Sequence, residues 1–368
     1  MRVFHVFGAM DVGGAELRTI ELLRHLGPQG FDFHFVTLTG REGALKDEIE
    51  ALGGTIHPLR LSVSFPVEFV RLLRRGNAEV LDSHVATFSG ALVFLAWIAR
   101  VPRRIAHFRS DGDGHPNTPR RRFQRRVMVS LIRRFATDVV GVSPSALTFG
   151  YRREWERDNS ARVVTNGVPP FVQSSAASNL RSLVGAGAAE PVLIHVGRPS
   201  PEKNRRLAVR VVHWLHQHDV PAHLALVGGT GPDSSAIHND AETMGIRTFV
   251  HDLGARSDAV ELMSQADALI LTSVREGLPG VVLEALSTGT PVVASDLPGV
   301  EFVATRVRGV RRVALDEPLS SWGIAVRDSL EAARRKEARD AIRESFDQST
   351  FSMEVSVAAH RAMYEGDR

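Results

Sequence analysis

Two glutamates lie eight positions apart in a segment rich in glycine and proline. Glu276 opens the sequence EGLPGVVLEALSTGTPVVAS, and Glu284 follows within it. Residues 277–280, Gly-Leu-Pro-Gly, predict a turn, after which a helix that carries Glu284 begins. A helix N-terminus presents free N–H groups to phosphate oxygens or sugar hydroxyls, and carboxylates accept hydrogen bonds from hydroxyls. The segment therefore predicts a site for sugar hydroxyls and phosphate.

The same pair raises the alternative of a glycoside hydrolase, in which two carboxyl groups act as acid and base. Eight positions along a continuous helix separate two residues by about 12 Å at roughly 1.5 Å per residue. Hydrolytic pairs are about 5 to 9.5 Å apart. The turn before the helix makes this separation of about 12 Å less certain, but it does not favour the shorter distance of a hydrolytic pair. Hydrolysis is therefore the weaker hypothesis.

Cations suited to phosphate lie in the segment VGRPSPEKN, which contains Arg198 and Lys203. An arginine binds two phosphate oxygens with its planar fork, and a lysine acts as a mobile point charge. Gly13 and Gly14 lie in an early strand-to-helix loop, where backbone N–H groups can approach the same anion. The alternatives are a surface salt bridge for each cation and a plain tight turn for the glycines.

Asp111-Gly112-Asp113 is an Asp-x-Asp pattern, which binds a metal ion in some enzymes. Two aspartates are too few ligands for a calcium loop, so we interpret the triplet as a loop or acceptor contact and expect no metal. Residues 8–14 contain neither Gly-x-Gly-x-x-Gly nor a phosphate-binding Gly-Lys-Ser/Thr loop, which disfavours dinucleotide and P-loop chemistry.

Short runs of Val, Ile and Phe alternate with segments of helical period, which predicts α/β domains with doubly wound parallel sheets. The pattern runs through the first half, is interrupted by a Ser/Ala/Gly-rich segment, and restarts at PVLIHVG. We predict two Rossmann-like domains that face each other across a cleft. The predicted parts are an N-terminal domain at 1–172, a linker at 173–190, a C-terminal domain at 191–350, and a terminal helix at 351–368 that packs back toward the N-terminal domain.

Composition limits the cellular setting. The 368 residues are 43% apolar and contain no cysteine, and no stretch approaches the roughly 20 apolar residues of a spanning helix. Residues 100–134 are densely basic, yet Phe108 and Phe123 are the only Phe, Trp or Tyr residues among them, which disfavours nucleic acid. An anionic membrane surface, a phosphorylated acceptor or a plain solvated helix fits this segment. We expect a cytoplasmic protein, with peripheral contact at the inner membrane face as one option.

EGLPGVVLEALSTGTPVVAS resembles the Glu-x7-Glu motif of the family-four glycosyltransferases, which have the GT-B fold. Further segments match this family in the expected order: GGAE at 13–16, VSPSA at 142–146, TNGV at 165–168, VGRPSPEKN, VGGTGP at 227–232 and DLGARSDAVELMSQADALILTS at 252–273. The resemblance covers nearly the whole chain. The turn rich in Gly and Asp that usually follows the second glutamate is absent here, where EFVATRVRGVRRVALDEP stands instead.

The resemblance implies a retaining, metal-independent transfer of a sugar from a nucleoside diphosphate sugar to an acceptor hydroxyl, without a cofactor. It implies that Glu276 contacts the donor sugar, Glu284 the ribose, and Arg198 and Lys203 the diphosphate. His107 matches a family histidine near the reacting sugar, and a satisfied structural histidine is its alternative. The implied catalytic residues are Glu276, His107, Arg198 and Lys203. The donor-binding residues are Gly13, Gly14, Gly197, Arg198, Lys203, Gly229, Glu276, Gly277, Leu278, Pro279, Gly280 and Glu284, and the acceptor-binding residues are His107, Arg109, Asp111 and Asp113.

Two other functions are weighed against this one. A GT-B sugar-nucleotide epimerase needs an acid and a base positioned at the sugar ring, and the sequence identifies no pair of residues for these roles. A non-catalytic sugar-nucleotide-binding protein would be expected to have lost one of the two cations or two glutamates, and all four are present. The donor sugar, the base and the acceptor (a glycolipid, a polysaccharide precursor or a natural product) stay open, as does the oligomeric state.

Overall fold

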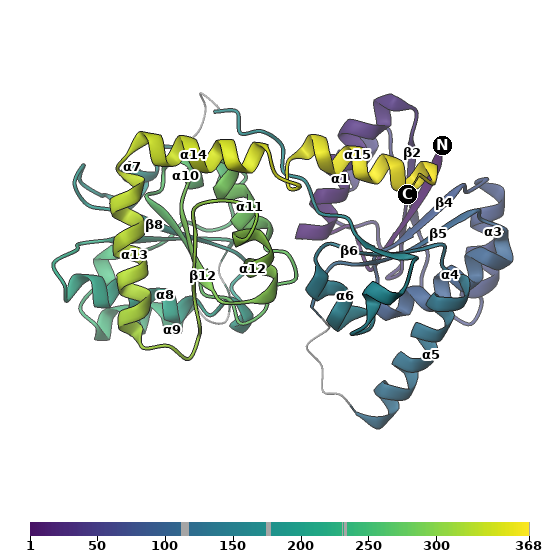
Figure 1. The fold of residues 1–368 in the computed structure, drawn as a ribbon, viewed down its shortest axis with the longest axis horizontal. Helices are drawn as coiled ribbons and strands as arrows, with labels where there is room; N and C mark the ends of the chain where they lie inside the picture. The colour runs from purple at the N-terminus through teal and green to yellow at the C-terminus, as the bar shows by residue number, and fades with distance from the viewer. Residues whose placement is uncertain (112–117, 174–177, 230, 232–233, 368) are drawn as a thin grey trace. The chain divides into compact units, whose positions relative to one another are not determined.

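The computed structural model describes residues 1–111, 118–173, 178–229, 231 and 234–367 (Figure 1). Two compact units make up the chain. The first comprises Met1–Gly167 with Met353–Arg368, and the second comprises Val168–Ser352. In the part of the chain that is described, no helix is long and apolar enough to cross a membrane.

The first unit is built on a parallel sheet of seven strands in the order β3-β2-β1-β4-β5-β6-β7. Its strands are β1 (Arg2–Phe7), β2 (Asp32–Thr37), β3 (Thr55–Pro58), β4 (Val80–Ser83), β5 (Arg103–Phe108), β6 (Asp138–Gly141) and β7 (Ala161–Val163). Its helices are α1 (Gly14–Leu26), α2 (Lys46–Ala51), α3 (Phe65–Arg75), α4 (Ser89–Ala99), α5 (Pro119–Phe135), α6 (Pro144–Gly150) and α15 (Met353–Glu365).

Helix α1 illustrates how the sequence forms these units. Its buried face contains Ile20, Leu23 and Leu26 at helical spacing, and Gly27 with Pro28 ends the helix. The terminal helix α15 belongs to the same unit, since Met363 and Tyr364 are part of the buried core with the α1 leucines.

The second unit has a parallel sheet of six strands in the order β10-β9-β8-β11-β12-β13. Its strands are β8 (Val192–Val196), β9 (His223–Val227), β10 (Val250–Asp252), β11 (Ala268–Leu271), β12 (Val292–Ser295) and β13 (Val310–Val313). Its helices are α7 (Leu180–Val184), α8 (Arg205–His216), α9 (Ser234–Thr243), α10 (Ala259–Gln265), α11 (Gly280–Ser287), α12 (Pro298–Ala304), α13 (Leu319–Ala333) and α14 (Lys336–Asp347). Short 3-10 turns, η1 (Gly27–Gln29), η2 (Ala86–Phe88), η3 (Trp155–Arg157), η4 (Pro201–Lys203) and η5 (Arg247–Phe249), complete the list for both units.

The predicted α/β class with two doubly wound parallel sheets is confirmed. The units divide at Gly167 and Val168, whereas the sequence suggested a boundary at 172. The segment suggested as a linker, 173–190, contains α7, whose Leu180 and Val184 are buried in the second unit. The chain therefore enters the second unit before the apolar strand pattern restarts.

Each sheet reverses its strand order at one place. In the first unit the reversal lies between β1 and β4, and in the second it lies between β8 and β11. Ligands of doubly wound sheets bind at the carboxyl ends of the strands beside such a reversal. The edge beside the reversal is therefore the expected ligand site of each sheet.

Candidate functional site

The second unit brings two of the predicted residues into direct contact at its reversal point. Lys203 lies in the loop after β8 and Glu276 in the loop after β11. The Lys203 ammonium donates to Glu276 Oε1 at 2.6 Å, and both side chains are mostly buried. Because parallel strands end at the same edge, residues 73 positions apart meet here.

The backbone around Lys203 is fixed by side chains of the neighbouring strands. Thr272 Oγ1, just after β11, donates to the carbonyl oxygens of Lys203 and Asn204 at 3.1 and 2.9 Å. Buried His195 of β8 contacts the Lys203 carbonyl at 3.3 Å through Nε2. A carbonyl only accepts, so Nε2 carries the proton. Burial lowers the pKa of His195 to about 3, which keeps the ring neutral.

Glycines allow the loops after β8 and β9 to lie almost in contact. A Cβ on Gly228, whose φ is +129°, would overlap the carbonyl oxygen of Gly197. Arg205, 2% exposed at the start of α8, donates to the carbonyl oxygens of Gly197, Val227 and Gly229. The buried guanidinium thus fixes the predicted glycines, whereas Arg198 in the same loop is exposed and accessible to a ligand.

The loop 276–279 leads directly into α11, which begins at Gly280 and carries partly buried Glu284 in its second turn. Helix α11 has no side-chain cap within the described chain, so its leading amide groups are available to a ligand. Gly299 of α12 supports this loop from behind, because a Cβ there would overlap the carbonyl oxygen of Gly277. Leu278 and Pro279 are buried and fix the turn.

In the first unit, the predicted glycines form the start of α1. Gly13 is the N-cap residue and Gly14 the first helical residue, and Gly13 has no side chain with which to cap the helix. A Cβ on Gly13 would overlap the Glu16 carboxylate. The absence of a side chain at Gly13 therefore lets the Glu16 carboxylate lie close to the N-terminus of α1, at the carboxyl end of β1. The predicted contact of these glycines with a diphosphate stays a prediction.

Beside this loop lies a buried polar cluster that the sequence analysis did not find. Residues at alternate positions of a strand share one face, so His5 of β1, Asp82 of β4 and His107 of β5 point to the same side of the sheet, with His84 and Arg109 just beyond the ends of β4 and β5. Helix α15 covers this side and adds His360 and Tyr364. We name these seven residues the α15 cluster.

Hydrogen bonds determine where the protons of the α15 cluster lie. Arg109 always donates, and its Nε lies 3.1 Å from His84 Nδ1, so the His84 proton is on Nε2. That Nε2 lies 3.1 Å from His5 Nδ1, which accepts. Asp82 accepts from His107 Nδ1 at 3.3 Å and from the Tyr364 hydroxyl at 3.1 Å.

Close ligand atoms of His5, Asp82 and His84 resemble a metal site, since all lie within 4.8 Å of one another. The proton pattern favours another explanation. A metal needs the lone pair of His84 Nε2, which the Arg109 bond converts into a donor, and it would stand near the Arg109 charge. The hydrogen-bond chain from Arg109 through His84 to His5 accounts for the close nitrogens.

Burial sets the charges of the cluster. Desolvation lowers the pKa of His5 and of His360 to about 3, and lowers those of His84 and His107 well below the usual value. Desolvation raises the pKa of Asp82, while the imidazoles and the Arg109 charge oppose that rise. The cluster therefore consists of neutral imidazoles around one cation and one carboxyl group.

The predicted acceptor residues occupy different environments. Arg109 is partly exposed and donates to Asn166 Oδ1 at 2.6 Å and to Thr19 Oγ1 at 3.4 Å. Asp111 accepts from Ser145 of α6 at 2.9 Å, and Asp113 lies outside the described residues. His107 is fully buried, so none of its atoms is accessible to a donor sugar in this structure. Its contact with the sugar stays a prediction.

Sequence reasoning missed Asp82, His84 and Tyr364. The run Leu-Asp-Ser-His at 81–84 carries a signal for the first two, because a carboxylate and an imidazole at alternate positions interrupt an otherwise buried strand. Tyr364 lies 282 residues from Asp82 and gives no such signal.

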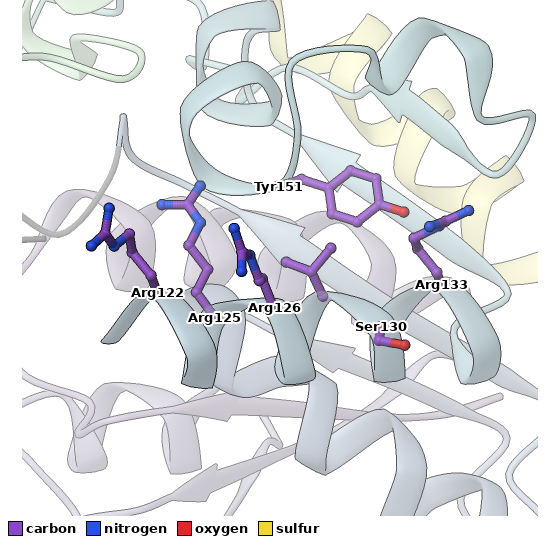
Figure 2. A pocket seen from close by; sticks show the side chains of 7 residues that line it. Arg122, Arg125, Arg126, Ser130, Arg133 and Tyr151 are labelled. Atoms are coloured by element: carbon purple, nitrogen blue, oxygen red, sulfur yellow. The ribbon is translucent and has the colours of Figure 1, made fainter. Parts of the chain in front are cut away.

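The basic segment forms α5, which is exposed along most of its length. A hollow of about 420 Å³ lies beside it and is lined by Arg122, Arg125, Arg126, Val129, Ser130, Arg133 and Tyr151. Figure 2 shows the three arginines 122, 125 and 126 on the side of α5 that faces Tyr151. Among the residues that the structure describes, no acidic side chain lines this hollow, so these walls attract anions.

Comparison with known proteins agrees with this architecture. The family model "Glycosyltransferase Family 4" matches residues 12–170, and "Glycosyl transferases group 1" matches residues 190–326. The chain is 28% identical over 302 residues to the capsular polysaccharide biosynthesis glycosyltransferase CapH of Staphylococcus aureus, covering 81% of this chain and 82% of CapH. It is 27% identical over 372 residues to the putative glycosyltransferase EpsF of Bacillus subtilis, covering 99% and 96%.

A solved structure extends the likeness to the whole fold. Anabaena HepE, crystallised with UDP and glucose, superposes with a TM-score of 0.80 at 20% identity, and the match covers 100% of both chains. With two parallel-sheet units, the predicted residues at the reversal point and family matches in both units, the chain belongs to glycosyltransferase family 4 and has the GT-B fold.

Proposed function

We propose that this glycosyltransferase transfers a sugar from a nucleoside diphosphate sugar to an acceptor hydroxyl with retention of the anomeric configuration and without a metal. The contact between Lys203 and Glu276 carries the proposal, because it joins a cation for the diphosphate to a carboxylate for the sugar. HepE, of the same fold, binds UDP and glucose, which agrees with this donor class.

Each residue has a physical task in this scheme. Negative charge grows on the leaving diphosphate, and Arg198, Lys203 and the first amides of α11 stabilise it. Glu276 accepts hydrogen bonds from donor-sugar hydroxyls, and Glu284 does so from the ribose. The leaving phosphate takes the acceptor proton in a front-face displacement, so the scheme uses no protein nucleophile.

The test is incubation with a panel of nucleoside diphosphate sugars and a metabolite extract, in the presence of EDTA. We expect release of nucleoside diphosphate and a product whose anomeric configuration, read by NMR, equals that of the donor. Lys203→Ala should lower turnover at least about 100-fold. The chain has three lysines, and Lys336→Ala, at the start of α14, is the matched control.

Three outcomes would contradict the proposal. Tight nucleotide binding without turnover would indicate a non-catalytic sugar-nucleotide-binding protein. Conversion of the donor sugar to its epimer without an acceptor would indicate an epimerase. Loss of activity in EDTA that Mg²⁺ or Mn²⁺ restores would remove the metal-independent mechanism.

We further propose that the acceptor is presented at an anionic membrane surface and that the first unit binds this surface through its α3, α4 and α5 helices. These helices pack in sequence, α3 on α4 and α4 on α5. Besides the α5 arginines they expose large apolar side chains, which are Val67, Trp97, Ile98, Phe123 and Val127. Cations with interspersed apolar groups suit lipid headgroups and the acyl boundary beneath them.

Vesicle co-sedimentation tests this second proposal. Binding to vesicles with 30% phosphatidylglycerol and no binding to pure phosphatidylcholine vesicles is expected, with a steep loss at high salt. Phe123→Ser combined with Arg122→Gln should weaken binding at least about 10-fold. A transferase that is fully active on a water-soluble acceptor and does not bind either vesicle would contradict it.

A further inference from the structure

The terminal helix α15 lies beside α1 in the first unit (Figure 1) and contributes His360 and Tyr364 to the α15 cluster. It reaches this place after the chain has completed the whole second unit, and its core residues Met363 and Tyr364 pack with α1 and β1. From α15, Tyr364 donates to Asp82 at 3.1 Å, and His360 lies against His107 with ring centroids 6.1 Å apart. The last residues of the chain thus complete a polar cluster at the reversal point of the first sheet.

We propose that Tyr364 and Asp82 are positioning residues for Arg109, and that Arg109 binds a phosphate group of a substrate at the carboxyl ends of β4 and β5. This inference rests on the proposed sugar transfer, because it assumes that this edge of the sheet is part of the site. Neither Tyr364 nor Asp82 touches the substrate in this scheme.

The partners of Arg109 leave its charge available. Its three recorded hydrogen bonds go to neutral atoms: His84 Nδ1, Asn166 Oδ1 and Thr19 Oγ1. These acceptors come from the residue after β4, the loop after β7 and α1, and together they fix the plane of the guanidinium. A planar, fixed fork that is partly exposed suits two oxygens of one phosphate group.

A largely buried cation requires a counter-charge, and Asp82 supplies it from the cluster. Asp82 is 0% exposed, and its charge acts on Arg109 as the main influence opposing desolvation of the guanidinium. The other titratable groups that face these two residues are His5, His84, His107 and His360, all neutral, and Glu16 of α1, which adds a weaker negative charge.

Tyr364 holds the carboxylate that supplies this charge. A hydroxyl that donates to a carboxylate stabilises its ionised form, and the Tyr364 bond counteracts the rise in the pKa of Asp82 that burial causes. Without the hydroxyl, Asp82 takes up a proton at a higher pH and Arg109 loses its counter-charge. A buried carboxyl group without a direct ion pair is costly to fold, so a purely structural role would favour an apolar residue at position 82.

The test uses the full chain with three variants and one control. Arg109→Lys keeps the charge and removes the fork, Asp82→Asn removes the counter-charge, and Tyr364→Phe removes one hydroxyl. Thr137→Val is the control, because the Thr137 hydroxyl bonds to the Arg104 carbonyl at the opposite, amino ends of the strands. Circular dichroism and thermal unfolding check that each variant folds.

Two binding measurements identify the phosphate. Affinity for UDP by calorimetry reports a donor phosphate, and KM for the acceptor at saturating donor reports an acceptor phosphate. We expect Arg109→Lys and Asp82→Asn to weaken one of these about 10-fold, as for loss of one charge-assisted hydrogen bond. Tyr364→Phe should weaken it about 3- to 5-fold, because Tyr364 acts on Arg109 only through Asp82. Thr137→Val should leave both unchanged.

The pH dependence separates positioning from plain stabilisation. The acid limb of the affected binding constant should move to higher pH in Tyr364→Phe, because protonation of Asp82 then begins sooner. Wild-type affinities and an unmoved acid limb in folded Tyr364→Phe would overturn the inference. If Asp82→Asn does not fold, Tyr364→Phe and Arg109→Lys still test whether Arg109 binds the phosphate group and whether Tyr364 positions it. A wild-type protein that binds UDP without transferring sugar refutes the proposed function alone, since the UDP measurements still test Arg109.

Discussion

The Lys203 ammonium lies 2.6 Å from Glu276 Oε1, so the two residues proposed for donor binding neutralise each other in the free protein. A bound donor must replace this ion pair with its own contacts. Its diphosphate then pairs with Lys203, and its sugar hydroxyls donate to the Glu276 carboxylate. The Lys203 ammonium is therefore already in position before the donor binds, so the site needs little reorganisation during transfer.

Glu276→Gln should separate these two tasks. The amide keeps the shape of the side chain and frees the Lys203 charge, so affinity for UDP should be unchanged or up to about fivefold higher, while kcat falls at least about 100-fold. Calorimetry with UDP and steady-state kinetics measure the two effects. The control is Glu202→Gln, which removes the exposed ion pair with Arg275. A parallel loss of UDP affinity and kcat would argue against this division.

Gly299→Ala should disturb the glutamate loop without touching a ligand. The new Cβ overlaps the carbonyl oxygen of Gly277, so the loop or α12 must shift. We expect a loss of about 1–3 kcal/mol in unfolding free energy and a higher donor KM, measured by urea denaturation and kinetics. Thr305→Ala at the end of the same helix is the comparison. A donor KM equal to that of the wild type would show that the loop tolerates the change.

Arg205→Lys should loosen the glycine loops while keeping the charge. Lysine cannot reproduce the fork that reaches the carbonyl oxygens of Gly197, Val227 and Gly229. Donor KM should rise about 10-fold. The adjacent Arg206, which pairs with Asp240 at the surface, provides the matched Arg206→Lys variant, for which unchanged kinetics are expected. Equal effects of the two substitutions would contradict the scaffolding role of Arg205.

Stability should fall in mild acid because of the buried histidines. In the unfolded chain these imidazoles have a pKa near 6.5, whereas burial lowers the pKa of His5 and of His360 to about 3. The unfolded state therefore binds more protons as pH falls from 6.5 toward 3, and each such histidine costs roughly 2 kcal/mol at pH 5. Protonation of Asp82 in the folded state offsets part of this loss.

Urea denaturation at pH 7.5, 6.0 and 5.0 measures this dependence. His360→Gln should reduce its slope, because one titrating group is removed from a fully buried position. His25→Gln, on the exposed side of α1, should leave the slope unchanged. A stability that is flat between pH 7.5 and 5.0 would contradict the buried, neutral state of the cluster.

The central strands could be predicted from the sequence because they are short apolar runs, whereas two edge strands, β3 and β13, were missed for the same reason. β3 is Thr-Ile-His-Pro, which pairs only with β2 and needs little apolar character. β13 is Val-Arg-Arg-Val, with both arginines exposed at the other sheet's edge. Edge strands lack a second neighbour, so polar residues and proline are tolerated there and the apolar signal disappears.

In the candidate site, the residues that lie in local motifs could be predicted from the sequence, whereas the contacts that depend on long-range pairing could not. Glu276 and Lys203 each lie in a recognisable loop, and the order of the strands brings the loops together. The α15 cluster depends on register, because His5 aligns with Asp82 only when β1 and β4 pair, and on the return of α15. No local pattern in the last helix indicates that Tyr364 bonds to a strand 282 residues earlier.

The return of α15 also determines the order in which the protein can mature. Met363 and Tyr364 fill the core of the first unit, yet they are synthesised only after the entire second unit. Until α15 has been synthesised, the first unit lacks these two residues of a core that also contains Ile20 and Phe33. The first unit of a nascent chain therefore completes its core only after the second unit and α15 have been made, and deletion of α15 should destabilise the first unit.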